Sequence, residues 1–433
     1  MEIEWETIGV IAGVISAILA FIQLLRRPKL KTPSPFDNSK YKQLEKALAD
    51  AKTAIGRTEL LLFLKWKYQS EPILERCGYT YPVAIYPAPI SQREDLQSVL
   101  NAPLIKHDDD DKPFVNESEY LNLLNSLKPG KGLTHGKEIN TFIYAMKSLV
   151  VAEKLQLKCK LGRFFTSYRS SEALEWEIRK KVSKLKGTSE KEFESFYNQL
   201  PLRKHLHGKV LNPVLDGTGR DAAIGISVLI AYNDKDVIKL MTKRRSSKGV
   251  PLRAGLLHVI PGFMFQPTTN DVDGEYDITH NIYREYLEEL FNLPENLNKN
   301  RHANHFDSDK RLVYLKTLIA EGSANLYFTG ITINLLNLRP EICTLLLIKT
   351  SDWYEKCQSD PELHWDLNDE FFSIHRLEDE GIVKPEELIE GVAFSTNDNK
   401  MLEDASIYPD RTVPAGAGAF WLGIDVLKDL LHV

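Results

Sequence analysis

The eight residues from Arg284 to Phe291, REYLEELF, constrain the fold more than any other stretch of the chain. On a helix, Glu285, Glu288 and Glu289 occupy positions i, i+3 and i+4, which places three carboxylates on one face. Like charges at these spacings destabilise a helix by about 0.2–0.5 kcal/mol per pair. Within the helix, Arg284 can offset the charge of only one of the three, Glu288, which lies four residues further on. A hard divalent cation such as Mg²⁺ would gather these oxygens. A solvated acidic helix face is the alternative.

The segments before this helix carry a second set of signals. A strand ends in the cations Lys243, Arg244 and Arg245, the apolar stretch 256–265 contains Pro261-Gly262, and Gly274-Glu275 precedes the helix. Together these segments resemble the signature of the Nudix family. That signature runs from Gly through five residues to Glu, then through seven residues to Arg-Glu-apolar-x-Glu-Glu-x-Gly-apolar.

The match covers both acidic pairs of the helix and departs from the family elsewhere. Arg284-Glu285 and Glu288-Glu289 match outright, and Glu275 matches the first Glu. Eight residues, in place of seven, separate Glu275 from Arg284. Phe263 stands where many members have a second Gly, and Phe291 replaces the Gly after the Glu-Glu pair. The helix chemistry is therefore intact, whereas the loop before it is altered.

The resemblance implies an α/β/α sandwich with a mixed sheet over residues 205–433, and a site for a phosphorylated ligand. It implies catalytic roles for Arg284, Glu285, Glu288 and Glu289, with the three glutamates as Mg²⁺ ligands. It also implies nucleotide or phosphate binding by Lys243, Arg244, Arg245, Gly262 and Glu275. The general base stays open between one of the glutamates and a loop residue such as Glu321. A solvated basic turn is the alternative for the cations.

Three histidines lie near these segments in the sequence. His258, in the stretch before Pro261, is expected to be packed. His302 and His305 lie in a polar loop from which they could reach a ligand, although chance explains them equally well.

After seven residues that include three glutamates comes an uncharged run, Ile8 to Leu25, followed by Arg26, Arg27, Lys29 and Lys31. Eighteen residues at about 1.5 Å each span roughly 27 Å, which is enough for the core of a bilayer. The cations after the run predict a single-pass anchor in the bacterial inner membrane, with the N-terminus outside and the soluble domains in the cytoplasm. A small-residue stripe in the run favours homo-oligomers.

The composition restricts the partners. The 433 residues carry a net charge of −5, which argues against a general nucleic-acid binder and predicts no DNA partner. The four cysteines have no metal-ligand spacing and are expected to be reduced.

Four regions follow from these patterns: an anchor at 1–31, a linker at 32–39, a mostly helical middle domain at 40–204 and the Nudix-like domain at 205–433. The middle domain is expected to contain helices at Tyr41–Tyr68, Glu138–Leu155 and Ser171–Leu185, and one that opens at the Ser189–Glu192 capping box. Its role stays open between a spacer and an oligomerisation platform.

The C-terminal half is predicted to alternate strands with helices. The predicted strands are Asp221–Tyr232, Val237–Lys243, Leu256–Phe265, Leu312–Ala320, Ala324–Leu335 and Ile342–Lys349. A last helix rich in small residues is expected after Val413.

Two functions fit this arrangement. The first is a sensor similar to the membrane-linked Nudix effectors of bacterial CBASS anti-phage systems, in which a cyclic oligonucleotide binds the Nudix-like domain and the anchor perturbs the membrane. The second is a membrane-tethered, Mg²⁺-dependent hydrolase of a nucleoside diphosphate linked to another group. A scaffold with an inactive Nudix domain is a third, weaker possibility.

Overall fold

A computed structural model describes residues 55–100, 102–106, 141–245, 256–293, 302–365 and 390–433, without the side chains of Arg244 and Glu390. All of these residues belong to one compact unit of the chain, Leu48–Val433.

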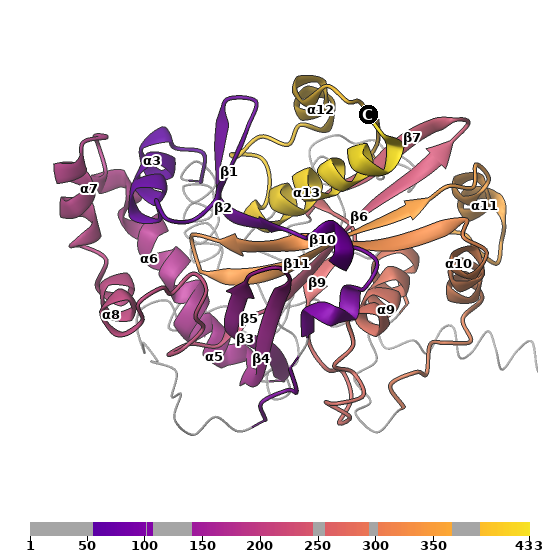
Figure 1. The fold of residues 1–433 in the computed structure, drawn as a ribbon, viewed down its shortest axis with the longest axis horizontal. Helices are drawn as coiled ribbons and strands as arrows, with labels where there is room; N and C mark the ends of the chain where they lie inside the picture. Colours follow the sequence, from indigo (N-terminus) through magenta and orange to yellow (C-terminus); the bar gives the residue numbers. More distant parts are fainter. Residues whose placement is uncertain (1–54, 101, 107–140, 246–255, 294–301, 366–389) are drawn as a thin grey trace, which may run out of the picture. The chain divides into compact units, whose positions relative to one another are not determined.

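A mixed sheet of nine strands forms the centre of this unit (Figure 1). Its main path runs β1-β2-β10-β11-β6-β7-β12, with β8 paired to β7 and β9 paired to β6. β11 and β6 run parallel, and the other pairs are antiparallel. The strands are β1 Ile73–Arg76, β2 Tyr79–Pro87, β6 Gly225–Asp234, β7 Val237–Arg244, β8 Leu257–Val259, β9 Gly262–Met264, β10 Ala324–Asn334, β11 Arg339–Ile348 and β12 Glu390–Ala393.

A smaller sheet has the order β4-β3-β5, and helices surround both sheets. Its strands are β3 Phe142–Val151, β4 Leu155–Arg163 and β5 Ala222–Ala223. The α-helices are α3 Thr58–Lys67, α5 Phe164–Ser167, α6 Ala173–Lys181, α7 Glu190–Tyr197, α8 Pro201–Lys209, α9 Ile278–Phe291, α10 Lys310–Ala320, α11 Trp353–Ser359, α12 Asp398–Ala405 and α13 Pro414–Leu431. Short 3-10 turns are η1 Ile90–Gln92, η2 Leu96–Leu100 and η4 Val182–Lys184, and η3 Tyr168–Glu172 is a π-helical turn.

Strand β6 shows how the large sheet separates two apolar cores. Side chains alternate along a strand, so Ile226, Val228 and Ile230 enter one core while Leu229 and Ala231 enter the other. Because both faces are buried, the strand reads as a continuous apolar run.

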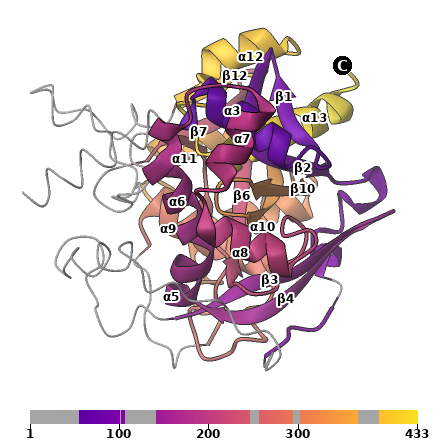
Figure 2. The ribbon, with the colours of Figure 1, turned by 90° about the vertical axis from the view of Figure 1, so that its left-hand side faces the viewer.

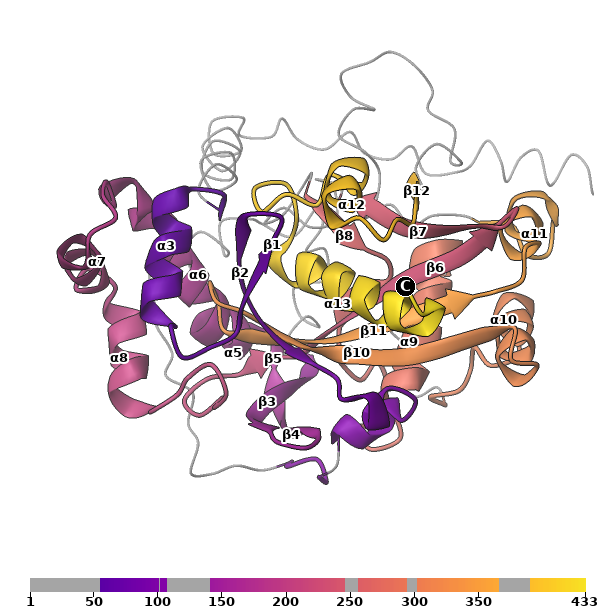
Figure 3. The same ribbon diagram turned by 45° about the horizontal axis from the view of Figure 1, so that its top comes forward.

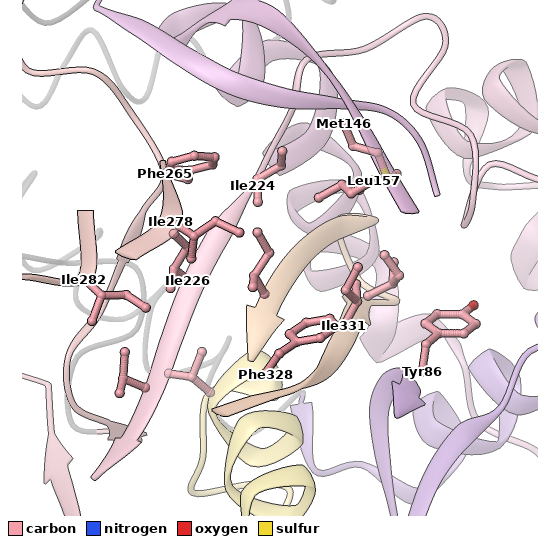
Figure 4. Close-up of a cluster of buried hydrophobic side chains, with 14 of the residues drawn as sticks. Tyr86, Met146, Leu157, Ile224, Ile226, Phe265, Ile278, Ile282, Phe328 and Ile331 are labelled. Atoms are coloured by element: carbon pink, nitrogen blue, oxygen red, sulfur yellow. The ribbon is translucent and has the colours of Figure 1, made fainter. Parts of the chain in front are cut away.

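Helix α13 covers one face of the sheet and packs on β2, β6, β10 and β11 (Figure 3). Glycines allow this close approach: a Cβ at Gly418 would lie 2.5 Å from Thr332, and one at Gly423 would lie 2.6 Å from Leu229. On the opposite face, Ile278 and Ile282 of α9 join a core with Ile226 and Phe265 (Figure 4). The mixed sheet between helices expected from the sequence is therefore present.

Several predicted elements are confirmed. The predicted hairpin β6–β7 is present, but its turn lies at Lys235 and Asp236, both with positive φ, because Asn233 and Asp234 still pair within the strands. The capping box is formed by Ser189 and Glu192 at the start of α7. Strands β10 and β11 and the last helix α13 also lie where the sequence placed them.

The prediction of a mostly helical middle domain is wrong. The segment predicted as a helix at Glu138–Leu155 contains β3, in which four consecutive residues from Ile143 to Met146 are buried. Burial of consecutive residues is typical of a strand covered on both faces, whereas a helix would bury one stripe. Strand β2 pairs with β10, so the large sheet also runs across the boundary predicted at residues 204 and 205.

The strand predicted at Leu312–Ala320 is also wrong, because this segment forms α10. Leu312, Leu315 and Leu318 are buried at a spacing of three residues, and the Asp309 side chain caps the helix by accepting from the Arg311 N–H. An aspartate before an apolar stripe at this spacing is a helix signal.

The predictions of a transmembrane helix in the fold and of an inner-membrane location are corrected here. Across the part of the chain that the structure describes, no helix combines the length and the apolar character needed to cross a bilayer. The predicted anchor, Ile8 to Leu25, lies outside the described residues. Neither prediction is carried further.

Candidate functional site

Helix α9 carries the acidic residues that the sequence singled out. Asp277 caps its first turn by accepting a hydrogen bond from the His280 N–H, and Asn292 ends it in the left-handed conformation, with φ of 52°. Phe291 is therefore still helical, and its ring stacks on Trp365 with centroids 6.0 Å apart. The residue that replaces the family's Gly needs no positive φ, because the following asparagine supplies it.

Arg284 is the centre of the site. Its side chain is 2% exposed, and its guanidinium lies 3.3 Å from Glu275, 2.8 Å from Glu285 and 3.7 Å from Glu288. The contact with Glu288 was expected from the i+4 spacing. The contacts with Glu275 and Glu285 were not, since the first crosses a loop and the second joins sequence neighbours. One cation thus fixes three carboxylates.

Glu275 holds the loop before α9 in place. It is fully buried and accepts hydrogen bonds from the Thr268 N–H and hydroxyl and from the Thr269 N–H, at 2.6–3.0 Å. Charge-assisted hydrogen bonds of this kind are stronger than neutral ones. The sequence analysis missed both threonines, and adjacent threonines six and seven residues before the matched glutamate were the available signal.

Glu289 is engaged by the backbone of β9. Its two carboxylate oxygens lie 3.1 and 3.2 Å from the Gly262 nitrogen, whose N–H donates to them, and the residue is 4% exposed. The side chains of Glu285 and Glu288 remain 12% exposed. The sequence placed all three on one helix face, but β9 lies over the last of them and engages it.

The donors fit a metal ion only as a pair. In residues 55–433, leaving out the gaps named above, no three His, Cys, Asp or Glu side chains converge as a metal site. Glu285 and Glu288 share one guanidinium, which keeps two hard oxygen donors together at the surface. Mg²⁺ is often held by one or two carboxylates with the phosphates of a ligand and water completing its shell. Two carboxylates suit that mode of binding.

Lys243 lies in the interior next to this acidic helix. Lys243 is 3% exposed, and its backbone lies opposite that of His258 where β7 pairs with β8. The charge of Glu289 affects the pKa of the Lys243 ammonium group. Burial lowers the pKa of Lys243 to about 7, while Glu289 acts in the opposite direction. Arg245 follows β7 and donates its N–H to the Leu256 carbonyl. The side chain of Arg244 lies outside the described residues.

Lys243 should make stability depend on pH. Its pKa is about 7 in the folded protein and near 10.5 when unfolded, so between these values the unfolded chain binds more protons. The free energy of unfolding therefore gains a term that rises with pH across this window. We expect urea denaturation to show a shallower rise from pH 7 to pH 10 in Lys243→Met than in the unchanged protein. Equal slopes would contradict the assigned pKa.

The region before residue 205 supports the loop that carries Glu275. The Tyr144 hydroxyl donates to the Val272 carbonyl at 2.8 Å, and its ring lies 4.3 Å from Phe265 and 5.2 Å from Tyr276. The Gln97 amide accepts from the Ile278 N–H at 3.0 Å and donates to the Tyr276 carbonyl at 3.2 Å. Strand β3 and turn η2 therefore hold both ends of the loop, which the sequence analysis did not foresee.

The remaining residues considered from the sequence are histidines and Glu321. His258 is buried against Gly262 and Gly416, as expected. His305 packs on Phe306, which also contacts His280 of α9 with ring centroids 5.0 Å apart. Burial lowers the pKa of His280, and the charge of Arg284 lowers it further. Glu321 is an exposed residue at the end of α10.

Comparison with known proteins adds no family assignment. A scan against models of protein families finds no match to the chain, and a search of curated proteins finds none either.

Proposed function

We propose that the described unit is a Nudix-like domain that binds a phosphorylated nucleotide together with Mg²⁺ at Glu285 and Glu288. The observation that carries this proposal is the set of contacts made by Arg284, which holds Glu275, Glu285 and Glu288 at once. The paired glutamates and the buried Glu275 correspond to the residues of the family signature. The likeness to membrane-linked effectors depended on the anchor and is not carried further.

The electrostatics of the pair support a cation between protein and ligand. Arg284 contributes one positive charge against three carboxylates, of which Glu275 is also held by N–H and hydroxyl donors. Glu285 and Glu288 share this one guanidinium, and each carboxylate carries a negative charge. A bound Mg²⁺ would offset this charge and would supply Lewis acidity to a phosphate. The protein's part is to hold the two oxygens in place through Arg284.

Hydrolysis of a diphosphate is the second candidate, and Lys243 favours it. A buried lysine with a pKa of about 7 can hold or release a proton near neutral pH. Glu289, whose charge acts on Lys243, accepts a hydrogen bond from the Gly262 N–H. Binding and hydrolysis thus share one site. They differ in whether water, giving up a proton to a base, attacks a phosphorus atom and the P–O bond to the leaving phosphate group breaks.

The test is calorimetric titration of the full chain with nucleoside diphosphate conjugates and cyclic di- and trinucleotides, with and without MgCl₂. We expect binding that depends on Mg²⁺, and a loss of about tenfold or more in affinity for Glu288→Gln, because one of two metal ligands is neutralised. Phosphate release from the same panel separates a hydrolase from a binding domain.

Glu403→Gln is the matched control, since Glu403 is an exposed glutamate on α12. We expect unchanged affinity in this variant. If Glu288→Gln binds every ligand as well as the unchanged protein does, the site is wrong. If no ligand of the panel binds with Mg²⁺, the proposed function is wrong.

A further inference from the structure

A second surface lies at the end of the unit formed by α3, α6 and α8, which faces the viewer in Figure 2. Residues 179–186 contain five cations and no acid, and α8 contains three cations and two histidines with no acid. The term "basic end" is used below for the surface formed by six exposed or half-buried lysines of these segments: Lys67, Lys180, Lys184, Lys186, Lys204 and Lys209.

Direct contacts bring these segments together. The Lys181 ammonium donates to the Gln199 carbonyl, and Glu177 of α6 accepts from the N–H groups of Leu202 and Arg203 in α8. The Tyr68 hydroxyl, at the end of α3, lies 3.2 Å from His207 Nε2. The lysines therefore belong to one assembly of helices. Acidic side chains are found on the neighbouring α7, which lies against α3.

An aromatic ring lies among these cations. The Lys67 ammonium sits 4.0 Å from the centroid of the half-buried Tyr197 ring, and the His207 ring is 5.8 Å from it. Arg203, which is fully buried beneath, donates to the Tyr68 hydroxyl and to the carbonyls of Leu335 and Leu336. All three acceptors are neutral, and Glu177, which accepts from the Arg203 N–H, is an acid whose charge interacts with Arg203.

Cations outnumber acids in residues 179–186 and in α8, even though the whole chain carries a net charge of −5. Burial and the charges of Arg203, Lys67 and Arg220 together lower the pKa of His207 to about 3. Burial raises the pKa of Glu177, while the charges of Arg203 and Lys181 act in the opposite direction. The prediction of no DNA partner was based on the net charge of the whole chain. A net charge does not show that cations are concentrated in one part of the protein.

We propose that the basic end binds single-stranded nucleic acid, with its lysines on the phosphates and a base taking the place of the Lys67 ammonium over the Tyr197 ring. Proteins that bind single strands combine cations along the backbone with aromatic rings under the bases. The spread of cations over three helices suits a polyanion better than a single phosphate. This surface is separate from the Glu285–Glu288 site, so the inference does not depend on the proposed function.

The test is fluorescence anisotropy of labelled oligo(U) and oligo(dT), each of about 20 nucleotides, with the full chain over a range of KCl concentrations. We expect binding that weakens with salt. In the triple variant Lys184→Gln, Lys204→Gln, Lys209→Gln, the affinity should fall by about tenfold or more at low salt. The slope of log K against log salt should become shallower by about 2, at 0.7 per lost phosphate contact.

The matched control is Lys154→Gln, Lys310→Gln, Lys400→Gln, which removes the same charge from three exposed lysines on other elements. We expect this control to stay within about twofold of the unchanged protein, because its lysines make no phosphate contact. Equal losses in both triple variants would show that net charge alone acts, and would overturn the proposal. Absence of binding to either oligonucleotide at low salt would overturn it too, as would displacement of the oligonucleotide by anionic lipid vesicles. The two oligonucleotides show whether RNA or DNA is preferred.

Discussion

Replacement of Arg284 by methionine is expected to destabilise the protein by about 3–5 kcal/mol, because it leaves buried acid without its cation. Glu275 is fully buried and keeps only the donors from Thr268 and Thr269 after the change. Glu285 and Glu288 would also repel each other without the shared guanidinium. Urea denaturation followed by circular dichroism measures the loss.

Two further variants make this expectation specific. The double variant Arg284→Met, Glu275→Gln removes both the buried cation and the buried carboxylate charge. It should therefore recover about 1–3 kcal/mol of the free energy of unfolding that Arg284→Met alone loses. Arg93→Met removes an arginine that pairs with the exposed Asp429, and it should lose less than about 1 kcal/mol. If Arg284→Met unfolds at the same urea concentration as Arg93→Met, the buried cation does not hold the site together.

The sequence predicted the helix of the site better than its loop. Amphipathic spacing gave α9 and the contact between Arg284 and Glu288, because both depend on residues within one turn. The position of Glu289 under Gly262 depends on how β9 packs, which no local pattern records. For the same reason Gln97 and Tyr144 were missed, since they reach the loop from far away in the sequence.

The fragment 205–433, predicted from the sequence as a domain, is expected not to fold alone. It lacks β2, which pairs with β10 from Val83↔Asn334 to Pro87↔Gly330, and it lacks β3, which supports the site loop. Tyr86 and Met146 of the missing segment also lie in the main core. Loss of a buried strand removes ladder hydrogen bonds and apolar burial together.

Thermal unfolding by circular dichroism measures this expectation, with the fragment 48–433 as the control because it matches the compact unit. We expect a cooperative transition for 48–433 and none for 205–433. A cooperative transition in the shorter fragment would contradict the role given to β2 and would restore the predicted domain boundary.

The errors in the fold have a common physical cause. The segment that forms β3 carries apolar residues at spacings that fit a helix, and its partners β4 and β5 decide the outcome. The hairpin β6–β7 was predicted correctly because its turn and both strands are adjacent in the sequence. Local signals thus identified elements whose partners are near, and failed where the partner is distant.

The place of β2 in the large sheet has a consequence for synthesis. Pro87 pairs with Gly330, so 243 residues (330 minus 87) separate the two partners along the chain. A ribosome that adds about 5–20 residues per second releases β2 well over ten seconds before β10. During that time β2 can pair with β1 but not with β10, and its open edge invites association between nascent chains. Overproduction should therefore gain more from chaperones that cover the early strand than from changes to the finished protein.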